Sequence, residues 1–185
     1  ESYDQATYVK HHKKKLLFLW SAQRHFAEKL KESGYSLCYI AIDNGDGIKS
    51  ITDAVKKTCS SYDNIDKIII TEPSEWHLLE EVKKWNKLFS FPVEIFPDDR
   101  FFVDQSFFKE WASKRKELRL EFFYREVRKK TGYLMNKKDP VGGAWNFDAS
   151  NRESYDDREK ITPVRSYKQD KVTKKVAQLI NQYFP

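Results

Sequence analysis

The stretch Lys67-Ile68-Ile69-Ile70-Thr71-Glu72-Pro73-Ser74 decides the predicted fold. Its three consecutive isoleucines predict a strand buried on both faces, because unbroken apolar runs are typical of parallel sheets covered by helices. Glu72-Pro73 ends the strand, and Ser74 is a candidate N-cap for the helix that follows. The apolar positions of that helix are Leu78, Leu79, Val82, Trp85 and Leu88.

The same alternation continues on both sides of this stretch. Ser36–Ile42 predicts a second buried strand, and Val93–Phe96 predicts a third. A polar turn at Asp43–Gly47 and a short helix, capped by Ser50 and Asp53 and running to about residue 60, connect the first two strands. This order predicts an α/β fold, a Rossmann-like parallel sheet with helices on both faces and right-handed crossovers.

The stretch Ala6–Glu32 predicts one long amphipathic helix, capped at its end by Gly34. No strand precedes it, so we expect the first strand to be missing and the chain to be a fragment. Its basic start, Lys10–Lys15, is either a solvated face or an anion-facing end. His11 and His12 are adjacent and point about 100° apart on a helix, so no metal role is assigned to them.

Two further helices are predicted at Ser106–Ala112 and Glu117–Thr131, the second stopped by Gly132. We expect Leu118, Phe122, Tyr124 and Val127 to face the core. The polar stretch after Arg152 leads to a last amphipathic helix whose apolar residues are Val172, Val176, Leu179, Ile180 and Phe184. The expected division is an α/β domain at residues 1–135, and at residues 136–185 a linker and short helix leading to an absent C-terminal domain.

The net charge of +6 favours nucleic acid or another anionic partner. Between Lys114 and Lys130, eight Lys/Arg face three Glu, which predicts a phosphate-contacting face built on Arg125, Arg128 and Lys129. Cys38 and Cys59 are too few for a disulfide framework or a zinc site and fit a cytoplasmic setting. No apolar run approaches the ~18 residues of a membrane span, so no membrane partner is expected.

The segment Pro140-Val-Gly-Gly-Ala-Trp-Asn-Phe-Asp-Ala-Ser-Asn-Arg152 mixes glycines, aromatic rings and polar groups. Such a segment is not a bare tether, because its rings need burial and its polar groups need partners. It is either a docking loop or a surface loop packed on its own domain. Within the chain there is no Gly-x-Gly-x-x-Gly and no Walker sequence.

Five segments together resemble the deoxyribodipyrimidine-photolyase-related family, whose characterised members are bacterial (6-4) photolyases and cryptochromes with an iron–sulfur cluster. The segments are Ala6–Lys15 with Ser21–Glu28, Thr71–Trp76, Asp99–Phe101, the stretch from Arg115 through Glu121–Glu126 to Thr131–Asn136, and Pro140–Arg152.

The resemblance implies an N-terminal antenna-type domain with a five-stranded sheet that can hold a ribityl-lumazine. It implies a following helical domain, outside this chain, that holds FAD, a four-iron four-sulfur cluster and the lesion in damaged DNA. That domain and the DNA are the implied partners. Reduced, excited FAD donates the electron that repairs the lesion, so the parent is expected to be a carbon–carbon lyase and this fragment alone is expected to be non-catalytic.

The resemblance also implies site residues. Gln5 stands where the family has a glutamate that contacts the lumazine, and Tyr8, one turn further on, can pack against a ring. Gln5 carries no charge, and the family's opening strand with its Gly-Asp-Gln turn is missing, so a different antenna or none is also open. The resemblance places Asp148, Asn151 and Arg152 at the domain interface, where Arg152 either binds a phosphate or pairs with Asp148.

Three hypotheses follow. The first is the N-terminal domain of a light-driven photolyase or of a cryptochrome that senses blue light. The second is a non-catalytic basic α/β module that binds nucleic acid or a protein partner. The third is a nucleotide-binding α/β enzyme whose glycine loop lies outside the chain.

Overall fold

The structure is a computed structural model that describes residues 1–44, 48–152, 154, 156 and 160–184, and only the backbone of residues 150 and 151. The chain forms two compact units. The first unit comprises Glu1–Asp66 and Pro163–Pro185, and the second comprises Lys67–Thr162. The division expected after residue 135 concerns the parent protein and stays a prediction.

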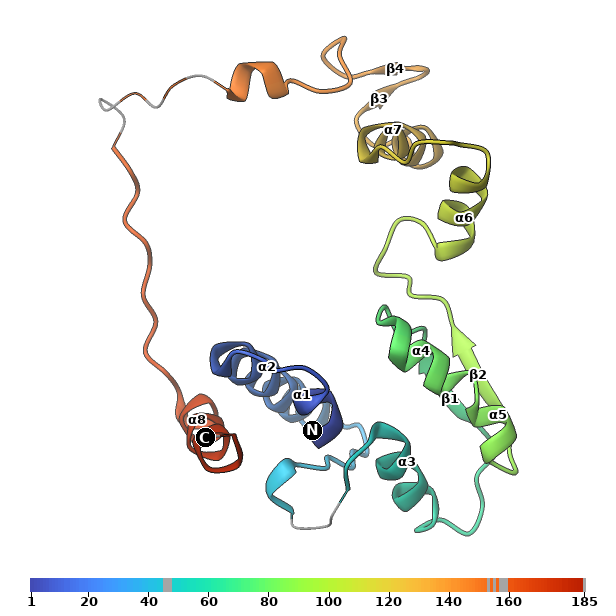
Figure 1. Cartoon of the computed structure of the whole chain (residues 1–185), viewed down its shortest axis with the longest axis vertical. Coiled ribbons are helices and arrows are strands. Elements are labelled where there is room, and N and C mark those ends of the chain that lie inside the picture. The colour runs from blue at the N-terminus through green and yellow to red at the C-terminus, as the bar shows by residue number, and fades with distance from the viewer. Residues whose placement is uncertain (45–47, 153, 155, 157–159, 185) are drawn as a thin grey trace. The chain divides into compact units, whose positions relative to one another are not determined.

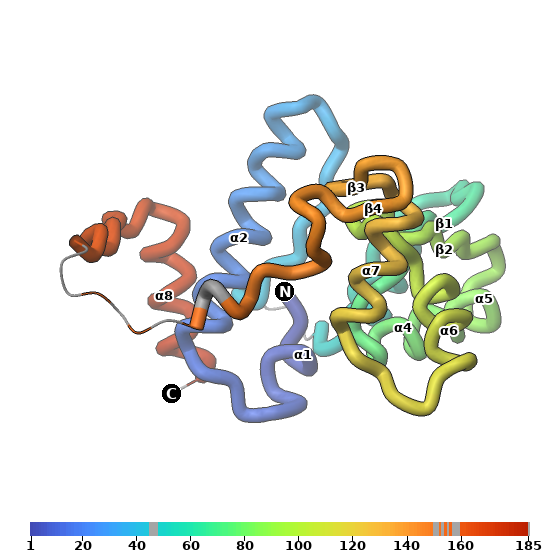
Figure 2. The backbone as a smooth tube through the Cα atoms, turned by 90° about the horizontal axis from the view of Figure 1, so that it is seen from above, coloured from blue at the N-terminus to red at the C-terminus, as the bar shows by residue number. Residues whose placement is uncertain are grey.

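The first unit is built on two helices that are far apart in sequence. Helix α2 (Lys13–Glu32) lies beside α8 (Lys171–Tyr183), as both views show (Figures 1 and 2). The predicted C-terminal amphipathic helix is thereby confirmed, because its apolar side chains pack against α2 and complete the hydrophobic core of the first unit. The buried members of this core are Ala6, Leu16, Trp20, Val176 and Ile180.

The single helix expected at Ala6–Glu32 is two helices, α1 (Tyr3–Thr7) and α2, so that prediction is wrong. His12 is in extended conformation, and its Nδ1 accepts a hydrogen bond of 3.1 Å from the Lys14 amide, which caps α2. The break leaves Lys10 and His11 outside the helices, while Lys13, Lys14 and Lys15 form the first turn of α2. Gly34 follows the C-cap with a φ of +85°, as expected.

The strand expected at Ser36–Ile42 does not form within the described residues. Residues 35–41 carry no helix or strand, and η1 (Ile42–Asn44) follows. A strand needs a neighbour for its backbone groups, and the described chain supplies none here. Residues 45–47 of the predicted turn lie outside the described residues. Helix α3 (Ile51–Cys59) is confirmed, with the Ser50–Asp53 capping box at its start.

The other two strands are confirmed and form the sheet of the second unit. Strands β1 (Ile68–Thr71) and β2 (Val93–Phe96) pair in parallel, with Ile68 opposite Val93 and Thr71 opposite Phe96. A small parallel sheet with helices fits the α/β class, while the wider Rossmann-like arrangement stays a prediction. The connecting helices are α4 (Trp76–Val82) and α5 (Trp85–Leu88).

The crossover is held to β2 by a side-chain clamp. Asn86 on α5 donates its Nδ2 to the Val93 carbonyl at 3.2 Å and accepts from the Val93 amide at 3.0 Å. Leu79, Val82 and Trp85 are buried as expected, whereas Leu88 is exposed. The N-cap is Glu75, without a side-chain bond, so the cap assigned to Ser74 is wrong.

The C-terminal half of this unit is a helical pair followed by a loop. Helix α6 (Gln105–Ser113) is capped by Asp104, and α7 (Leu120–Thr131) ends at Gly132, whose φ is +75°. Helix α7 begins three residues later than expected. The minimal hairpin β3 (Met135–Asn136) and β4 (Asp139–Pro140) follows, then η2 (Asp148–Asn151).

The face of α7 that packs inward differs from the predicted one. Phe123 contacts Phe107, Phe108 and the buried Trp111, with ring centroids 5.0 to 5.9 Å apart. Three of the residues expected to face the core are exposed instead, and Val127 is half-buried. The exposed residues are Leu118, Phe122 and Tyr124.

Candidate functional site: the basic face of α7 and its loop

The loop after β4 docks on the basic face of α7 through Trp145. Three cations lie 5.4 to 5.7 Å from its ring centroid, namely Arg125, Arg128 and Lys129. These are the three residues that the charge pattern selected, and they share a face because their spacing is three and four residues on a helix. Each such interaction contributes about 0.5–1 kcal/mol at exposed sites and more when desolvated. The loop therefore packs on the predicted basic face of its own unit, which matches the second of the two readings, a surface loop packed on its own domain.

Arg128 is the buried member of this site, with 5 % of its surface exposed. Its guanidinium donates to the carbonyls of Tyr133, Leu134 and Trp145 and to the Tyr124 hydroxyl. The turn before β3 and the loop after β4 are thus tied to one side chain. In this arrangement Arg128 is a structural clamp, and it presents no open face to a phosphate.

Arg125 and Lys129 flank the clamp and remain partly exposed. Arg125 pairs with Glu121, and Lys129 pairs with Glu126 at 3.0 Å. Glu121 also accepts a hydrogen bond of 2.9 Å from Asn146 of the loop. The acids of α7 therefore neutralise part of the charge, as the spacing of three and four residues predicts.

A cleft of about 830 Å³ opens beside this site. One wall is α7 and the other is the loop, which turns through Gly142 at a φ of +82°. A Cβ at Gly142 would lie 2.9 Å from the Phe147 ring, so both the backbone angle and the space require glycine. The lining combines apolar side chains with the carboxylates of Glu121 and Asp148.

The remaining predicted interface residues lie at the end of the loop. Asp148 lines the cleft and is exposed, and Arg152 is exposed just after η2, where its amide bonds the Ala149 carbonyl at 3.4 Å. The side chain of Asn151 lies outside the described residues. Among the ion pairs of the described chain there is none between Arg152 and Asp148. Their roles at a domain interface or on DNA stay predictions.

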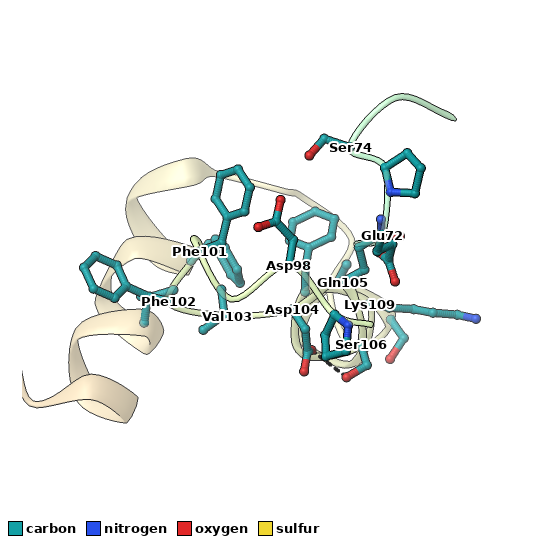
Figure 3. A pocket seen from close by; sticks show the side chains of 17 residues that line it. Glu72, Ser74, Asp98, Phe101, Phe102, Val103, Asp104, Gln105, Ser106 and Lys109 are labelled. Atoms are coloured by element: carbon teal, nitrogen blue, oxygen red, sulfur yellow. Dashed lines mark hydrogen bonds between the residues drawn. The ribbon is translucent and has the colours of Figure 1, made fainter. Parts of the chain in front are cut away.

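A second cleft, of about 1060 Å³, lies at the carboxyl ends of β1 and β2 (Figure 3). This is the edge where open α/β sheets bind ligands. Its lining includes the apolar side chains of Phe108, Phe123 and Val127 and the carboxylates of Glu72 and Asp98. The hypothesis of a nucleotide-binding enzyme stays untested, because the glycine loop it requires was placed outside the chain.

Asp98 of this cleft is already engaged in its own turn. Its carboxylate accepts from the Arg100 amide at 3.1 Å and from the Arg100 guanidinium at 2.8 and 2.6 Å. These hydrogen bonds, above all those from the guanidinium, lower the pKa of Asp98 below its ordinary value. Asp98 therefore stabilises the turn.

The predicted antenna residues lie in the other unit, on α1. Gln5 is half-buried, and its main-chain N–H donates to the Ser2 hydroxyl at 3.4 Å. Tyr8 ends α1, is 53 % exposed, and meets the His11 ring edge-on at 5.2 Å. Neither residue lines any of the clefts described for this chain. The assignment of these two residues to an antenna pocket stays a prediction.

Sequence reasoning missed the polar network around Glu1. The Glu1 carboxylate is fully buried and accepts from Arg24 at 2.6 and 2.8 Å, from Tyr39 at 2.8 Å and from the Ile42 amide at 2.9 Å. Burial raises the pKa of Glu1, but these hydrogen bonds outweigh it, so the pKa lies below its ordinary value. A glutamate and an arginine 23 residues apart carry no local signal of such a pairing.

No group of residues suited to a metal ion occurs among the described residues, and none of their helices is long and apolar enough to cross a membrane. Cys38 and Cys59 are free thiols.

Comparison with known proteins places the chain. A family profile described as "Deoxyribodipyrimidine photo-lyase-related protein" matches residues 1–185. The chain belongs to this family. It is 43 % identical over 183 residues to the (6-4) photolyase of Agrobacterium fabrum, covering 98 % of this chain and 36 % of that protein. It is 21 % identical over 155 residues to the uncharacterised protein R852 of Acanthamoeba polyphaga mimivirus, covering 82 % of this chain and 76 % of that protein.

Membership confirms the resemblance noted from the sequence segments. The chain spans about a third of the length of the (6-4) photolyase it matches. The Trp145 loop and the basic helix α7 both lie inside the matched region, so the site described above belongs to the part that the family shares with this chain.

Proposed function

We propose that this chain is the N-terminal part of a light-driven flavoprotein of the photolyase and cryptochrome type, which repairs UV photoproducts in DNA or senses blue light. The observation that carries the proposal is the 43 % identity to a (6-4) photolyase along 98 % of this chain. At that level of identity the local structures described above are expected to be shared. The parent protein would act in the cytoplasm on damaged DNA.

In this proposal the redox chemistry belongs to cofactors held outside this chain. FAD and a four-iron four-sulfur cluster would sit in a C-terminal helical domain of the same polypeptide, which is the chain's main partner. FAD would supply the electron, and this chain's residues would position the domain and the DNA. A 185-residue piece alone would not be catalytic.

An absorption spectrum of the purified full-length protein tests the proposal. We expect flavin absorption bands in the near-UV and blue, and a broad absorption from the iron–sulfur cluster. Illumination with a reductant should then restore UV-damaged oligonucleotides. A colourless full-length protein without flavin would refute the proposal, and a coloured protein without repair would assign it to signalling.

We propose Arg125 and Lys129 as the DNA-contacting cations of α7, joined by Asp148, Asn151 and Arg152 at the domain interface. The burial of Arg128 supports a different role for that residue, as the support beneath the other two. Removing one cation that neutralises a DNA phosphate lowers the slope of log K against log salt by roughly 0.9.

The double variant Arg125→Gln/Lys129→Gln of the full-length protein should weaken binding to damaged duplex DNA and reduce the salt slope by about 2. The matched control is Lys56→Gln/Lys57→Gln on α3, which removes the same charge elsewhere and should leave the slope unchanged. If both double variants have the same salt slope, Arg125 and Lys129 do not contact DNA and their role is structural.

We also propose Gln5 and Tyr8 as part of an antenna pocket for a ribityl-lumazine. Because Gln5 lacks the charge of the family's glutamate, Gln5→Glu should strengthen lumazine binding in the full-length protein. Fluorescence titration measures this, with Gln23→Glu on α2 as the control. Unchanged affinity would remove Gln5 from the pocket.

The competing proposal is a non-catalytic basic module that binds nucleic acid without light. The net charge of +6 favours it independently of the family. It predicts equal affinity for damaged and undamaged duplexes and no response to light. A preference for damaged DNA in the dark would already exclude it.

A further inference from the structure

Two thiols line one small cavity in the first unit. The cavity has a volume of about 340 Å³, and its walls include residues 38–40 and one face of helix α3. Cys38 lines it from the segment before η1, and Cys59 lines it from the last turn of α3. Both are free thiols, of which Cys38 is exposed and Cys59 is half-buried. Neither residue has a part in the functions proposed above.

Helix α3 presents Cys59 to this cavity. The helix residues that line the cavity follow one another at spacings of three and four, so they form one face of α3. They are Ile51, Ala54, Val55, Thr58 and Cys59. Cys59 is also the final residue of α3, so no further helical turn constrains it on its C-terminal side. The second thiol therefore lies on the side of the helix that faces Cys38.

A contact directs the Cys38 thiol toward the same face. Its Sγ lies 3.9 Å from the Thr58 Oγ1, which is within the range of a weak hydrogen bond that involves sulfur. The Thr58 hydroxyl donates its own hydrogen to the Ala54 carbonyl at 2.9 Å, so the thiol is the donor in this contact. Thr58 directly precedes Cys59 in the chain. The Cys38 sulfur therefore lies beside the helical turn that carries the second thiol.

The two thiols differ in a way that suits stepwise oxidation. The exposed Cys38 meets a small oxidant first, whereas burial raises the pKa of the Cys59 thiol and favours its protonated form. A metal site would need further ligands, and the described residues contain no group of three or more His, Cys, Asp or Glu suited to a metal ion. In a reducing compartment, disulfides are usually transient and redox-sensing.

We propose that Cys38 and Cys59 are a peroxide-responsive modification site, at which hydrogen peroxide converts the two thiols into an intramolecular disulfide. The Cys38 thiolate attacks one peroxide oxygen and forms a sulfenic acid, while the O–O bond breaks and the released hydroxide takes up a proton to become water. The Cys59 sulfur then attacks the Cys38 sulfur, loses its proton, and displaces the sulfenic hydroxyl as a second water. Two thiols are oxidised, and one peroxide is reduced to two waters.

Peptide mapping of the full-length protein tests this site. The reduced protein is treated with a small excess of hydrogen peroxide, blocked with N-ethylmaleimide and digested with trypsin. We expect the peptides of residues 32–49 and 58–67 as one linked species, which has two hydrogens fewer than the separate peptides and which dithiothreitol separates again. Its yield should not change when the protein is diluted before oxidation, because both thiols belong to one molecule. Absence of the linked species, or a link between the Cys38 residues of two molecules, would overturn the proposal.

Two variants of the full-length protein distinguish the position of the second thiol from its mere presence. In Cys59→Ser the linked species should be absent, and dimedone should trap Cys38 as a sulfenic acid; an unlabelled Cys38 would contradict the first step. Cys59→Ser/Lys57→Cys keeps both thiols but moves the second by about 200° around α3, so it should form far less of the linked species. Equal yields in this variant and in the unchanged protein would overturn the site. These readouts do not depend on flavin, light or DNA, so the thiol site and the light-driven function fail separately.

Discussion

Replacing Arg128 with methionine should detach the loop that follows α7. Methionine keeps the apolar stem and the helix propensity of the site, so the change isolates the guanidinium. The guanidinium makes four hydrogen bonds, three of them to main-chain carbonyls. Lys129→Met is the matched control, because it removes one positive charge from the next position of the same helix.

The structure sets the expected size of the difference. Hydrogen bonds from a charged donor contribute about 1.5–3 kcal/mol each, but water can replace the guanidinium at Tyr133 and Leu134, whose surfaces are 60 % and 63 % exposed. A net cost of about 3 kcal/mol follows for Arg128→Met. Lys129 makes an exposed pair with Glu126 and one ring contact, so its removal should cost less than about 1 kcal/mol.

Urea unfolding followed by fluorescence measures both values, and limited proteolysis between residues 132 and 147 reports on the loop itself. We expect rapid cleavage there in Arg128→Met and slow cleavage in Lys129→Met. Arg128→Lys should resemble the methionine variant, because an ammonium cannot reproduce the planar fork that serves several carbonyls. Equal unfolding costs for positions 128 and 129, with the loop still protected, would refute the clamp.

Two more predictions concern other parts of the molecule. Gly142→Ala and Gly143→Ala both place an alanine in the left-handed conformation, at a cost of about 1 kcal/mol. Only the methyl group at position 142 meets the Phe147 ring, so Gly142→Ala should lower the unfolding midpoint further. Equal midpoints would contradict the close approach of Gly142 to this ring. Glu1→Gln should destabilise the 185-residue chain at neutral pH and progressively less in acid. The pKa of Glu1 is lowered by folding, so its contribution is complete above the ordinary carboxyl pKa and disappears as pH falls through the lowered value. A constant difference between the two proteins from pH 7 to pH 3 would argue against the buried pair.

The elements that could be predicted are those encoded by neighbouring residues. The isoleucine run at 68–70 predicts β1, the Ser50–Asp53 box predicts the start of α3, and Gly132 predicts the end of α7, because each signal acts within a few residues. The segment Ser36–Ile42 has an equally strong local pattern. A strand also needs a neighbouring strand, however, and the apolar run itself does not determine which strand lies beside it.

The candidate site shows the same limit. The charge pattern located Arg125, Arg128 and Lys129, but it could not tell that the middle one is buried while its neighbours stay at the surface. That difference arises because Trp145, seventeen residues further on than Arg128, folds back over the helix. The exposed position of Phe122 also depends on a tertiary contact, because the inward face of α7 is set by the packing of Phe123 on α6.

The parallel sheet of the second unit has a practical consequence. Strand β1 is paired with β2 along one edge, and no other strand of the described chain borders it. Ile69 on this strand is 54 % exposed. An open, isoleucine-rich border of this kind templates the addition of strands from other molecules, which is the first step of aggregation. Samples of this chain should therefore lose monomer as they are concentrated, and a lysine at position 69 should keep them in solution.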